Sequence, residues 1–514
     1  VCTVFRNKIM RQPLIKMFSL PTHSRRSILR TLLAIESLER RDVPSATILM
    51  TPGQYSQTDF PGPKSDLEIT YTIAWVNGRD IHNRPIDFNN DGYADFLTTD
   101  VLGTSYGDTI AGNAAIPLLS DQQGGFQQTR VGNGFATLKS DSQAAFDWNG
   151  DGFLDFATVS SDLDGEITYA LYQNNGLGEF AAVIGQNLPG NYTGKYGAFS
   201  YSLTMGDLNK DGALDMVCRL VDAKTFRLFY GQLENGGWNG KFNTTGYLDL
   251  QGATGPFFAN SVIADFNNDG NPDIATGGGK GARLFINDGT GNFPSGGSMD
   301  LDSASGYSNL CLAAGDVDGD GLVDLVSTKR EQLTLTNSPW TPVSLYINTT
   351  TTSTAGNPTF QPAREISGSS SFGPLQLNDM NLDGKLDVVV IDAIDGGLNP
   401  QPTQQYYVLA FEPAGTFTQS TFSGFQRPPQ NAQGFSVADW NKDGQLDVAV
   451  GAGPIYSTPA SVYYPPESLS ITVGLGYNAT FVPPSLKTSQ IPPATLGQPF
   501  SFQLTGANGV KTLP

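Results

Sequence analysis

The chain has 514 residues, of which 59 are Gly, 15% are charged and 11% are aromatic. This composition is typical of many short strands joined by turns. A formal net charge of −19 would repel nucleic-acid backbones and anionic membrane surfaces, so we expect neither as a partner. Only two histidines are present, His23 and His82, which leaves little for a histidine-based zinc site or a Ser-His-Asp triad. We therefore expect a β-rich protein that binds cations and is not an enzyme.

The first 45 residues have the character of a leader. Their best apolar stretch, ILRTLLAI, is too short to cross a membrane. Residues 24–30, SRRSILR, have the form of a twin-arginine export signal, and a short basic helix without a targeting role is the alternative. The segment RRSILRTLLAIESLERRDVPSA resembles the leader-like segment of large exported repeat proteins in planctomycete-type bacteria. We expect residues 1–45 to be poorly ordered and to direct export, which makes the protein extracytoplasmic, secreted or bound to the cell surface, with no membrane span.

One nine-residue motif, D-x-[DN]-x-D-G-x-x-D, occurs seven times. It begins at Asp87, Asp147, Asp207, Asp265, Asp316, Asp379 and Asp439, at spacings of 60, 60, 58, 51, 63 and 60 residues. Apolar, β-branched runs such as DFATVS and DLVST follow it, and short apolar segments such as SVIA precede it. These flanks predict a strand, a loop and a second strand, and apolar runs ending in Gly/Asn turns predict a third and a fourth strand in most repeats.

The residue types in this loop suit calcium. The ion takes about six to eight oxygen ligands, and the side chains at positions 1, 3 and 5 of the loop can converge on one point. Gly at position 6 permits the sharp turn, position 7 would offer its backbone carbonyl by analogy with the EF-hand loop, and Asp at position 9 would close the shell. The EF-hand itself is excluded, because position 12 never holds Glu. The predicted ligands are Asp87, Asn89, Asp91, Tyr93, Asp95; Asp147, Asn149, Asp151, Phe153, Asp155; Asp207, Asn209, Asp211, Ala213, Asp215; Asp265, Asn267, Asp269, Asn271, Asp273; Asp316, Asp318, Asp320, Leu322, Asp324; Asp379, Asn381, Asp383, Lys385, Asp387; and Asp439, Asn441, Asp443, Gln445, Asp447.

The charge balance points to the same loops. They hold 22 of the 49 acidic residues, and the other 27 nearly balance the 30 Lys and Arg. Three crowded carboxylates repel one another unless a cation lies between them. A metal-free turn is the alternative, since Asn, Asp and Gly favour turns, but such a turn does not need Asp at position 9. Magnesium prefers a smaller octahedral shell and transition metals prefer nitrogen or sulfur, so we expect up to seven Ca²⁺ ions.

Seven copies of a four-stranded unit fit a closed ring better than an open stack, because closure removes exposed sheet edges. The fold prediction is an all-β, seven-bladed β-propeller over residues 46–485, with material before Asp87, including LEITYTIAWV, completing the last blade. Residues 486–514 resemble a linker and the truncated start of an immunoglobulin-like domain. The residues at loop position 2 are expected to pack between blades rather than to form a sugar platform; they are Phe88, Trp148, Leu208, Phe266, Val317, Met380 and Trp440.

The repeated motif resembles FG-GAP and VCBS-type repeats, the calcium-binding propeller repeats of integrin α-subunit heads and many bacterial surface proteins. GFSVADWNKDGQLDVAVGAGP comes nearest, while most repeats lack a strict FG-GAP tripeptide. The resemblance implies structural calcium on the face away from the ligand. It also implies a binding or adhesion scaffold for an unknown protein or glycan, formed by a monomeric propeller within a larger surface protein. Two alternatives stay open, a propeller enzyme acting on polysaccharide as a lyase or dehydratase, and a purely architectural cell-wall repeat.

Overall fold

The structure is a computed structural model, and it describes residues 58–61, 73–100, 114–122, 126–129, 131, 142–161, 167–190, 203–220, 225–251, 260–277, 282–294, 297–301, 307–331, 343–351, 356–366, 375–380, 383–392, 405–411, 417–421, 435–440, 442, 446–450 and 468–471. All of them belong to one compact unit, Ile48–Phe481. The predicted leader and the predicted immunoglobulin-like segment lie outside the described residues.

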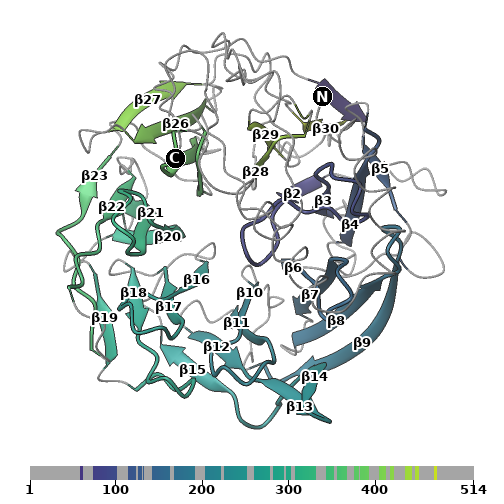
Figure 1. Cartoon of the computed structure of the whole chain (residues 1–514), viewed down its shortest axis with the longest axis horizontal. Coiled ribbons are helices and arrows are strands. Elements are labelled where there is room, and N and C mark those ends of the chain that lie inside the picture. The colour runs from purple at the N-terminus through teal and green to yellow at the C-terminus, as the bar shows by residue number, and fades with distance from the viewer. Residues whose placement is uncertain are drawn as a thin grey trace, which may run out of the picture. The chain divides into compact units, whose positions relative to one another are not determined.

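The described strands form six four-stranded antiparallel sheets in chain order, which is consistent with propeller blades (Figure 1). The first sheet contains β2 (Ile73–Asn77), β3 (Phe96–Asp100), β4 (Ala114–Ser120) and β5 (Phe126–Gln128). The second contains β6 (Ser142–Phe146), β7 (Asp155–Ser161), β8 (Ile167–Asn174) and β9 (Phe180–Leu188). The third contains β10 (Leu203–Gly206), β11 (Asp215–Arg219), β12 (Thr225–Phe229) and β15 (Leu248–Gln251), with the hairpin β13 (Gly231–Glu234) and β14 (Gly237–Phe242) inserted before its last strand.

The fourth sheet contains β16 (Ser261–Ala264), β17 (Asp273–Thr276), β18 (Arg283–Phe285) and β19 (Ser298–Asp300). The fifth contains β20 (Tyr307–Gly315), β21 (Asp324–Glu331), β22 (Ser344–Tyr346) and β23 (Arg364–Glu365). The sixth contains β24 (Leu375–Asn378), β25 (Asp387–Asp392), β26 (Gln405–Phe411) and β27 (Phe417–Thr421). Two smaller pairs complete the set, β28 (Phe435–Ala438) with β29 (Asp447–Val450), and β1 (Thr58–Pro61) with β30 (Ser468–Ile471).

The predicted order of strand, loop and strand is confirmed. In the fourth repeat β16 ends at Ala264, the motif begins at Asp265, and position 9 of the motif, Asp273, is the first residue of β17. All four residues of β17 are buried, because its sheet is covered on both faces by its neighbours. The motif therefore always lies at the same end of its sheet, between the first and the second strand.

The position-2 residues pack against the sheet of the following repeat, as predicted. The ring of Phe88 lies 4.9 Å from that of Phe180 in the second sheet. In the last repeat, Trp440 stacks on Phe96 of the first sheet with 4.7 Å between ring centroids. Trp148 is partly buried against the cluster shared by the second and third sheets. The other position-2 side chains are buried: Leu208, Phe266, Val317 and Met380.

The two described strands before the first motif belong to different sheets. Thr58–Pro61 pairs with Ser468–Ile471 in antiparallel register, so part of the N-terminal material does pair with a late segment, and β30 in turn contacts β29. The prediction that LEITYTIAWV belongs to the last blade is wrong for its second half. Ile73–Asn77 is the first strand of the first sheet and pairs with β3, because an apolar segment in front of the motif occupies the same position here as in every other repeat.

Candidate metal centre

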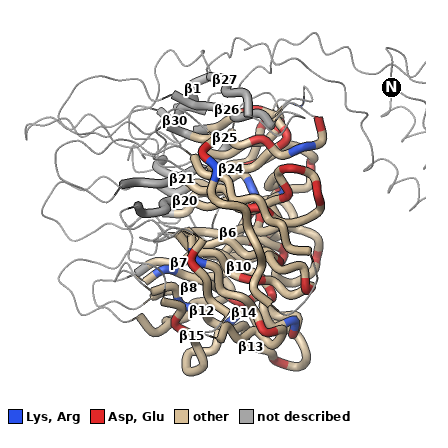
Figure 2. Tube along the Cα trace, turned by 90° about the vertical axis from the view of Figure 1, so that its left-hand side faces the viewer, with Lys and Arg blue, Asp and Glu red and all other residues tan. Residues whose placement is uncertain are grey.

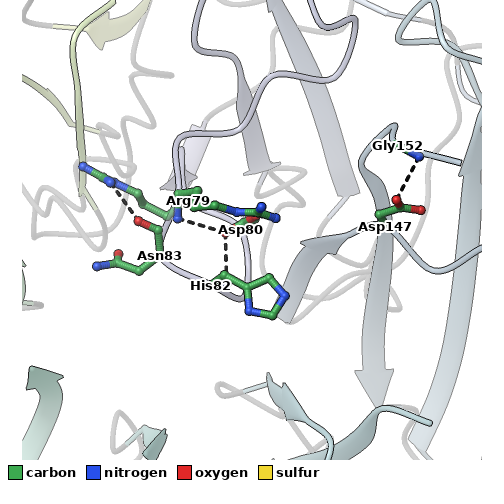
Figure 3. Close-up of polar contacts among 7 residues, drawn as sticks. Arg79, Asp80, His82, Asn83, Asp147 and Gly152 are labelled. Carbon is green, nitrogen blue, oxygen red and sulfur yellow. Dashed lines mark hydrogen bonds and ion pairs between the residues drawn. The ribbon is translucent and has the colours of Figure 1, made fainter. Parts of the chain in front are cut away.

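Each metal loop folds around its own side-chain oxygens. In the fourth repeat Asp265 accepts hydrogen bonds from the backbone N–H groups of Asp269 (3.1 Å) and Gly270 (2.8 Å). Asn267 accepts from Asp269 N (3.2 Å), and Asp269 accepts from Asn271 N (2.8 Å). Loop positions 1, 3 and 5 thus turn their oxygens toward the inside of the loop. The same pattern recurs in the loops that begin at Asp87, Asp147 and Asp207. Figure 3 shows the hydrogen bond from Gly152 to Asp147.

Two loop positions have left-handed backbone. The glycine at position 6 has φ between 83° and 90° in the described loops, which confirms that this position needs glycine. Position 4 is also left-handed, with φ of 53° at Asn90, 58° at Lys210 and 56° at Asn268. Sequence reasoning treated position 4 as free. Its occupants were the signal, because Asn or Gly stands there in four of the seven motifs and both tolerate this conformation.

The aspartate at position 9 is fully buried and joins the loop to two strands. Asp273 accepts one hydrogen bond from Phe266 N (3.0 Å) and another from Asn287 N at the end of β18 (2.8 Å). Burial raises the pKa of Asp273 to about 7, and these two N–H groups lower it only in part. The corresponding pKa is about 7 at Asp95 and Asp155, and about 6 at Asp215 and Asp324. A cation in the loop would favour the ionised form of each of these carboxyl groups.

The loop of the fifth repeat brings three carboxylates together. One oxygen from each of Asp316, Asp318 and Asp324 lies within 4.8 Å of the other two. Burial raises the pKa of Asp318, and the neighbouring charge of Asp320 raises it further. Positions 1, 3 and 9 of this loop therefore form a cluster that could hold a metal ion. Position 5, Asp320, is outside the cluster and accepts a hydrogen bond from Leu322 N (2.9 Å).

The other loops differ at position 3, where they carry Asn. The side-chain amide of that Asn donates to the carboxylate at position 5 over 2.8–3.2 Å in the first four repeats. Asp318 supplies a carboxylate where the other loops have an amide oxygen, so among the described residues positions 1, 3 and 9 form a cluster of three acidic groups in the fifth loop. The predicted ligands Asn381, Asn441, Asp443 and Gln445 lie outside the described residues.

A second set of polar residues, which sequence reasoning missed, links the metal loops of the second, fourth and fifth repeats to the preceding repeat. Asn287 follows β18 and donates to Leu208 O of the third repeat (2.7 Å) and to Pro272 O of its own loop (2.9 Å). Its side-chain oxygen accepts from Gly289 N and Gly291 N, both at 3.0 Å. Asn174 and Asn348 make the same pair of donations. We call these three residues the clamp asparagines. The signal was an Asn that ends or follows the third strand.

Arginines of the third strands form further links. Arg283 forms an ion pair with Asp300 of the next strand (2.9 Å) and donates to Gln251 O of the third sheet (2.8 Å). Arg227 is fully buried, holds both carboxylate oxygens of Asp249 (2.6 and 2.8 Å) and donates to a carbonyl at the end of the second sheet (2.6 Å). Arg283 thus ties the fourth sheet to the third, and Arg227 ties the third sheet to the second.

The third repeat has no clamp asparagine, because Gly231 stands at that position. A side chain there would clash, since a Cβ atom would lie 2.6 Å from Ala213 Cβ and 2.7 Å from Leu214 O. The hairpin of β13 and β14 links the sheets instead. Phe242 packs on Tyr169 of the second sheet, with 4.9 Å between ring centroids, and its backbone exchanges two hydrogen bonds with the side chain of Gln186 (2.7 and 2.9 Å).

Acidic residues dominate the loop side of these sheets. Figure 2 shows many of the described Asp and Glu residues along one side of the trace, in accordance with the common position of the motifs. Within the described ranges, no helix has the length and apolar character required to cross a membrane.

The repeats are similar to a known family of repeats. The family profile described as FG-GAP-like repeat matches residues 147–218, 234–327 and 379–450, which include six of the seven motifs. A lectin of Agrocybe aegerita, described as recognising non-reducing terminal N-acetylglucosamine, is 14% identical with a TM-score of 0.44, and the match covers 74% of this chain and 92% of the lectin. The Tc holotoxin pore of Photorhabdus luminescens is also 14% identical, with a TM-score of 0.32; the match covers 72% of this chain and 15% of the toxin chain. No curated protein matches.

Proposed function

Since the chain contains FG-GAP-like repeats, we propose that it is an extracytoplasmic calcium-binding β-propeller that serves as a binding or adhesion scaffold. The observation that carries this proposal is the convergence of Asp316, Asp318 and Asp324 in a loop whose sequence recurs seven times. Oxygen ligands without nitrogen or sulfur favour a hard cation, and calcium accepts a flexible shell of carboxylate, amide and carbonyl oxygens. The ion would be structural, because the loop joins the first two strands of each repeat.

We extend the proposal to seven sheets in a closed circuit. The first strands of successive repeats contact one another from β6 to β28, and β28 contacts β2. Trp440 stacks on Phe96, and the ammonium group of Lys442 lies 3.4 Å from the ring centroid of Tyr93, so the last repeat meets the first in the same way as other neighbours meet. Because neighbouring sheets pack face to face, closure of this kind covers one face of the first sheet and one face of the last.

The decisive experiment measures thermal unfolding and bound calcium together. Each ion that binds only the folded state stabilises it by about 2.7 kcal/mol at a calcium concentration of about 100 times the Kd. We expect a chelator to lower the Tm strongly, Ca²⁺ to restore it and Mg²⁺ to restore it poorly. A protein that melts at the same temperature with no bound metal would refute the proposal.

A matched pair of variants tests the fifth loop. Asp318→Asn gives it the residue found in the other loops, so we expect the number of bound ions to stay the same and the affinity of one site to fall. Asp316→Ala removes a carboxylate of the cluster together with the acceptor for three loop N–H groups, so we expect the loss of one ion. If both variants bind the same number of ions as the unaltered protein, with the same affinities, no ion binds in this loop.

The partner is proposed to be a protein or a glycan, bound by a monomeric propeller of a larger, secreted or cell-surface protein, away from the metal loops. Incubating the calcium-loaded protein with acidic and neutral polysaccharides distinguishes this role from catalysis. Retention on an immobilised glycan or protein without new chain ends is expected, whereas the appearance of unsaturated or shortened products would favour a lyase or dehydratase. The absence of both would favour an architectural role.

A further inference from the structure

The first repeat contains an insertion that the other described repeats lack. In the fourth repeat the first strand ends at Ala264 and the motif begins at the next residue. In the first repeat β2 ends at Asn77 and the motif begins at Asp87, so nine residues, 78–86, lie between them. Figure 1 shows this segment in dark purple, between β28 and β6.

One end of the insertion is attached to repeats that are distant in the sequence. Gly78 N donates to Ser436 Oγ (2.9 Å), and Arg79 Nε donates to Val437 O (2.8 Å), both within β28. Arg79 Nη2 also donates to Asn378 Oδ1 at the end of β24 (2.6 Å). The fit is tight, since a Cβ atom on Gly78 would lie 2.8 Å from Ser436 Oγ. One guanidinium thus joins the first sheet to two late repeats.

The middle of the insertion contacts the repeat on the other side. Ile81 N donates to Ala145 O of β6 (3.0 Å), and the side chain of Ile81 packs on the apolar cluster shared by the second and third sheets. The insertion therefore spans from β24 and β28 on one side of the first sheet to β6 on the other.

Internal hydrogen bonds hold the insertion in shape (Figure 3). The buried carboxylate of Asp80 accepts from His82 N and Arg84 N (both 2.9 Å) and forms an ion pair with the Arg84 side chain (2.6 Å). Arg79 Nη1 donates to the carbonyl of Asn83 (2.8 Å), whose φ of 59° reverses the chain. Ile86 N returns to Gly78 O (2.9 Å), which closes the loop.

We propose that residues 78–86 form a latch that fastens the first sheet to β28 and β24, and that releasing it opens this joint while the joints between the middle sheets remain closed. The latch supplies one buried donor, Gly78 N, and the part-buried guanidinium of Arg79 to acceptors in β28 and β24. An acceptor that loses its donor inside the protein destabilises the fold locally. The latch therefore adds polar links to a joint that is also held by the stacking of Trp440 on Phe96.

Native-state hydrogen exchange tests the latch in the full chain. In Arg79→Met we expect the amides of β2, β24 and β28 to exchange about tenfold faster, and those of β16 and β17 to keep their rates. His82→Ala is the matched control, because that side chain is exposed and its contact to Asp80 is made by the backbone. If Arg79→Met does not fold, Ser436→Ala decides, since it removes only the acceptor of Gly78 N.

Two outcomes would overturn the latch. One is unchanged exchange in β28 of Arg79→Met or Ser436→Ala, and the other is equal acceleration in every sheet. The measurement is made with Ca²⁺ and with chelator. If the calcium proposal is wrong, the exchange rates will be the same with Ca²⁺ and with chelator. If the latch proposal is wrong, the acceleration in the variants will not be confined to β2, β24 and β28. The two failures are therefore distinguishable.

Discussion

The joint between the third and fourth sheets differs from the joint between the second and third, although both connect four-stranded sheets of the same order. The joint between the third and fourth sheets has the clamp asparagine Asn287, two residues after β18, and Arg283, the first residue of β18. The joint between the second and third sheets keeps the arginine, Arg227, but has Gly231 in place of the asparagine and adds the hairpin that carries Phe242. Apolar packing can therefore replace a polar clamp, at the cost of an insertion.

Each of the two joints has a buried aspartate at position 9. We expect the largest effect, a dependence of stability on pH, to arise at both. Burial raises the pKa of Asp273 to about 7 and that of Asp215 to about 6 in the folded protein, above the ordinary aspartate value of 3.8. The folded protein without calcium therefore binds protons more tightly than the unfolded chain, and its stability should fall as the pH rises from 4 to 7. Urea unfolding in chelator at several pH values checks this, and Asp273→Asn should reduce the slope. A stability that rises over this window would contradict the assignment.

The hairpin joint should respond most to loss of its aromatic anchor. Phe242 is buried and packs on Tyr169 and Trp238. Phe242→Ala should lower the free energy of unfolding by about 3–5 kcal/mol, because it leaves a cavity between two sheets. Leu233→Ala on the exposed face of the same hairpin should change it by less than about 0.5 kcal/mol. Equal effects of the two variants would mean that the hairpin does not join the sheets.

The polar joint should respond to the loss of its clamp. Asn287→Ala leaves the buried carbonyl of Leu208 and the part-buried carbonyl of Pro272 without this donor, and two turn N–H groups without their acceptor. We expect a loss of about 2–3 kcal/mol in the free energy of unfolding. Asn292→Ala, in the same turn, removes an exposed hydrogen bond to Thr290 and serves as the control. A larger effect of the control would show that the turn matters rather than the clamp.

The smallest effect is expected at the glycine that distinguishes the two joints. Gly231→Ala places a methyl group against Ala213 and Leu214, so we expect a destabilisation of about 1–2 kcal/mol, measured by chemical denaturation. Gly246→Ala, which meets no atom within 4 Å, is the control. A stabilised Gly231→Ala would mean that the position has room, and that an asparagine clamp could be built there.

The local features of this protein could be predicted from its sequence, while the connections between repeats could not. The motif, the strands on both sides of it, the glycine at position 6 and the packing of residues such as Phe88 all follow from short-range pattern and turn chemistry. Asn287 looked like an ordinary turn residue, since its partner Leu208 is 79 residues away. Arg79 and Val437 are 358 residues apart, and one sequence carries no signal for such a pair. The metal cluster was predicted for seven loops, and the structure brings three carboxylates together where Asp replaces Asn at position 3.

The pairing of Thr58–Pro61 with Ser468–Ile471 has a consequence for biosynthesis. The first of these strands leaves the ribosome about four hundred residues before its partner, so it must wait while the intervening repeats are made. During that interval its hydrogen-bonding edge has no partner within the chain, and premature pairing with another copy becomes a route to aggregation. Pairing of β1 can therefore occur only after residues 468–471 have been made, when the intervening repeats are already complete.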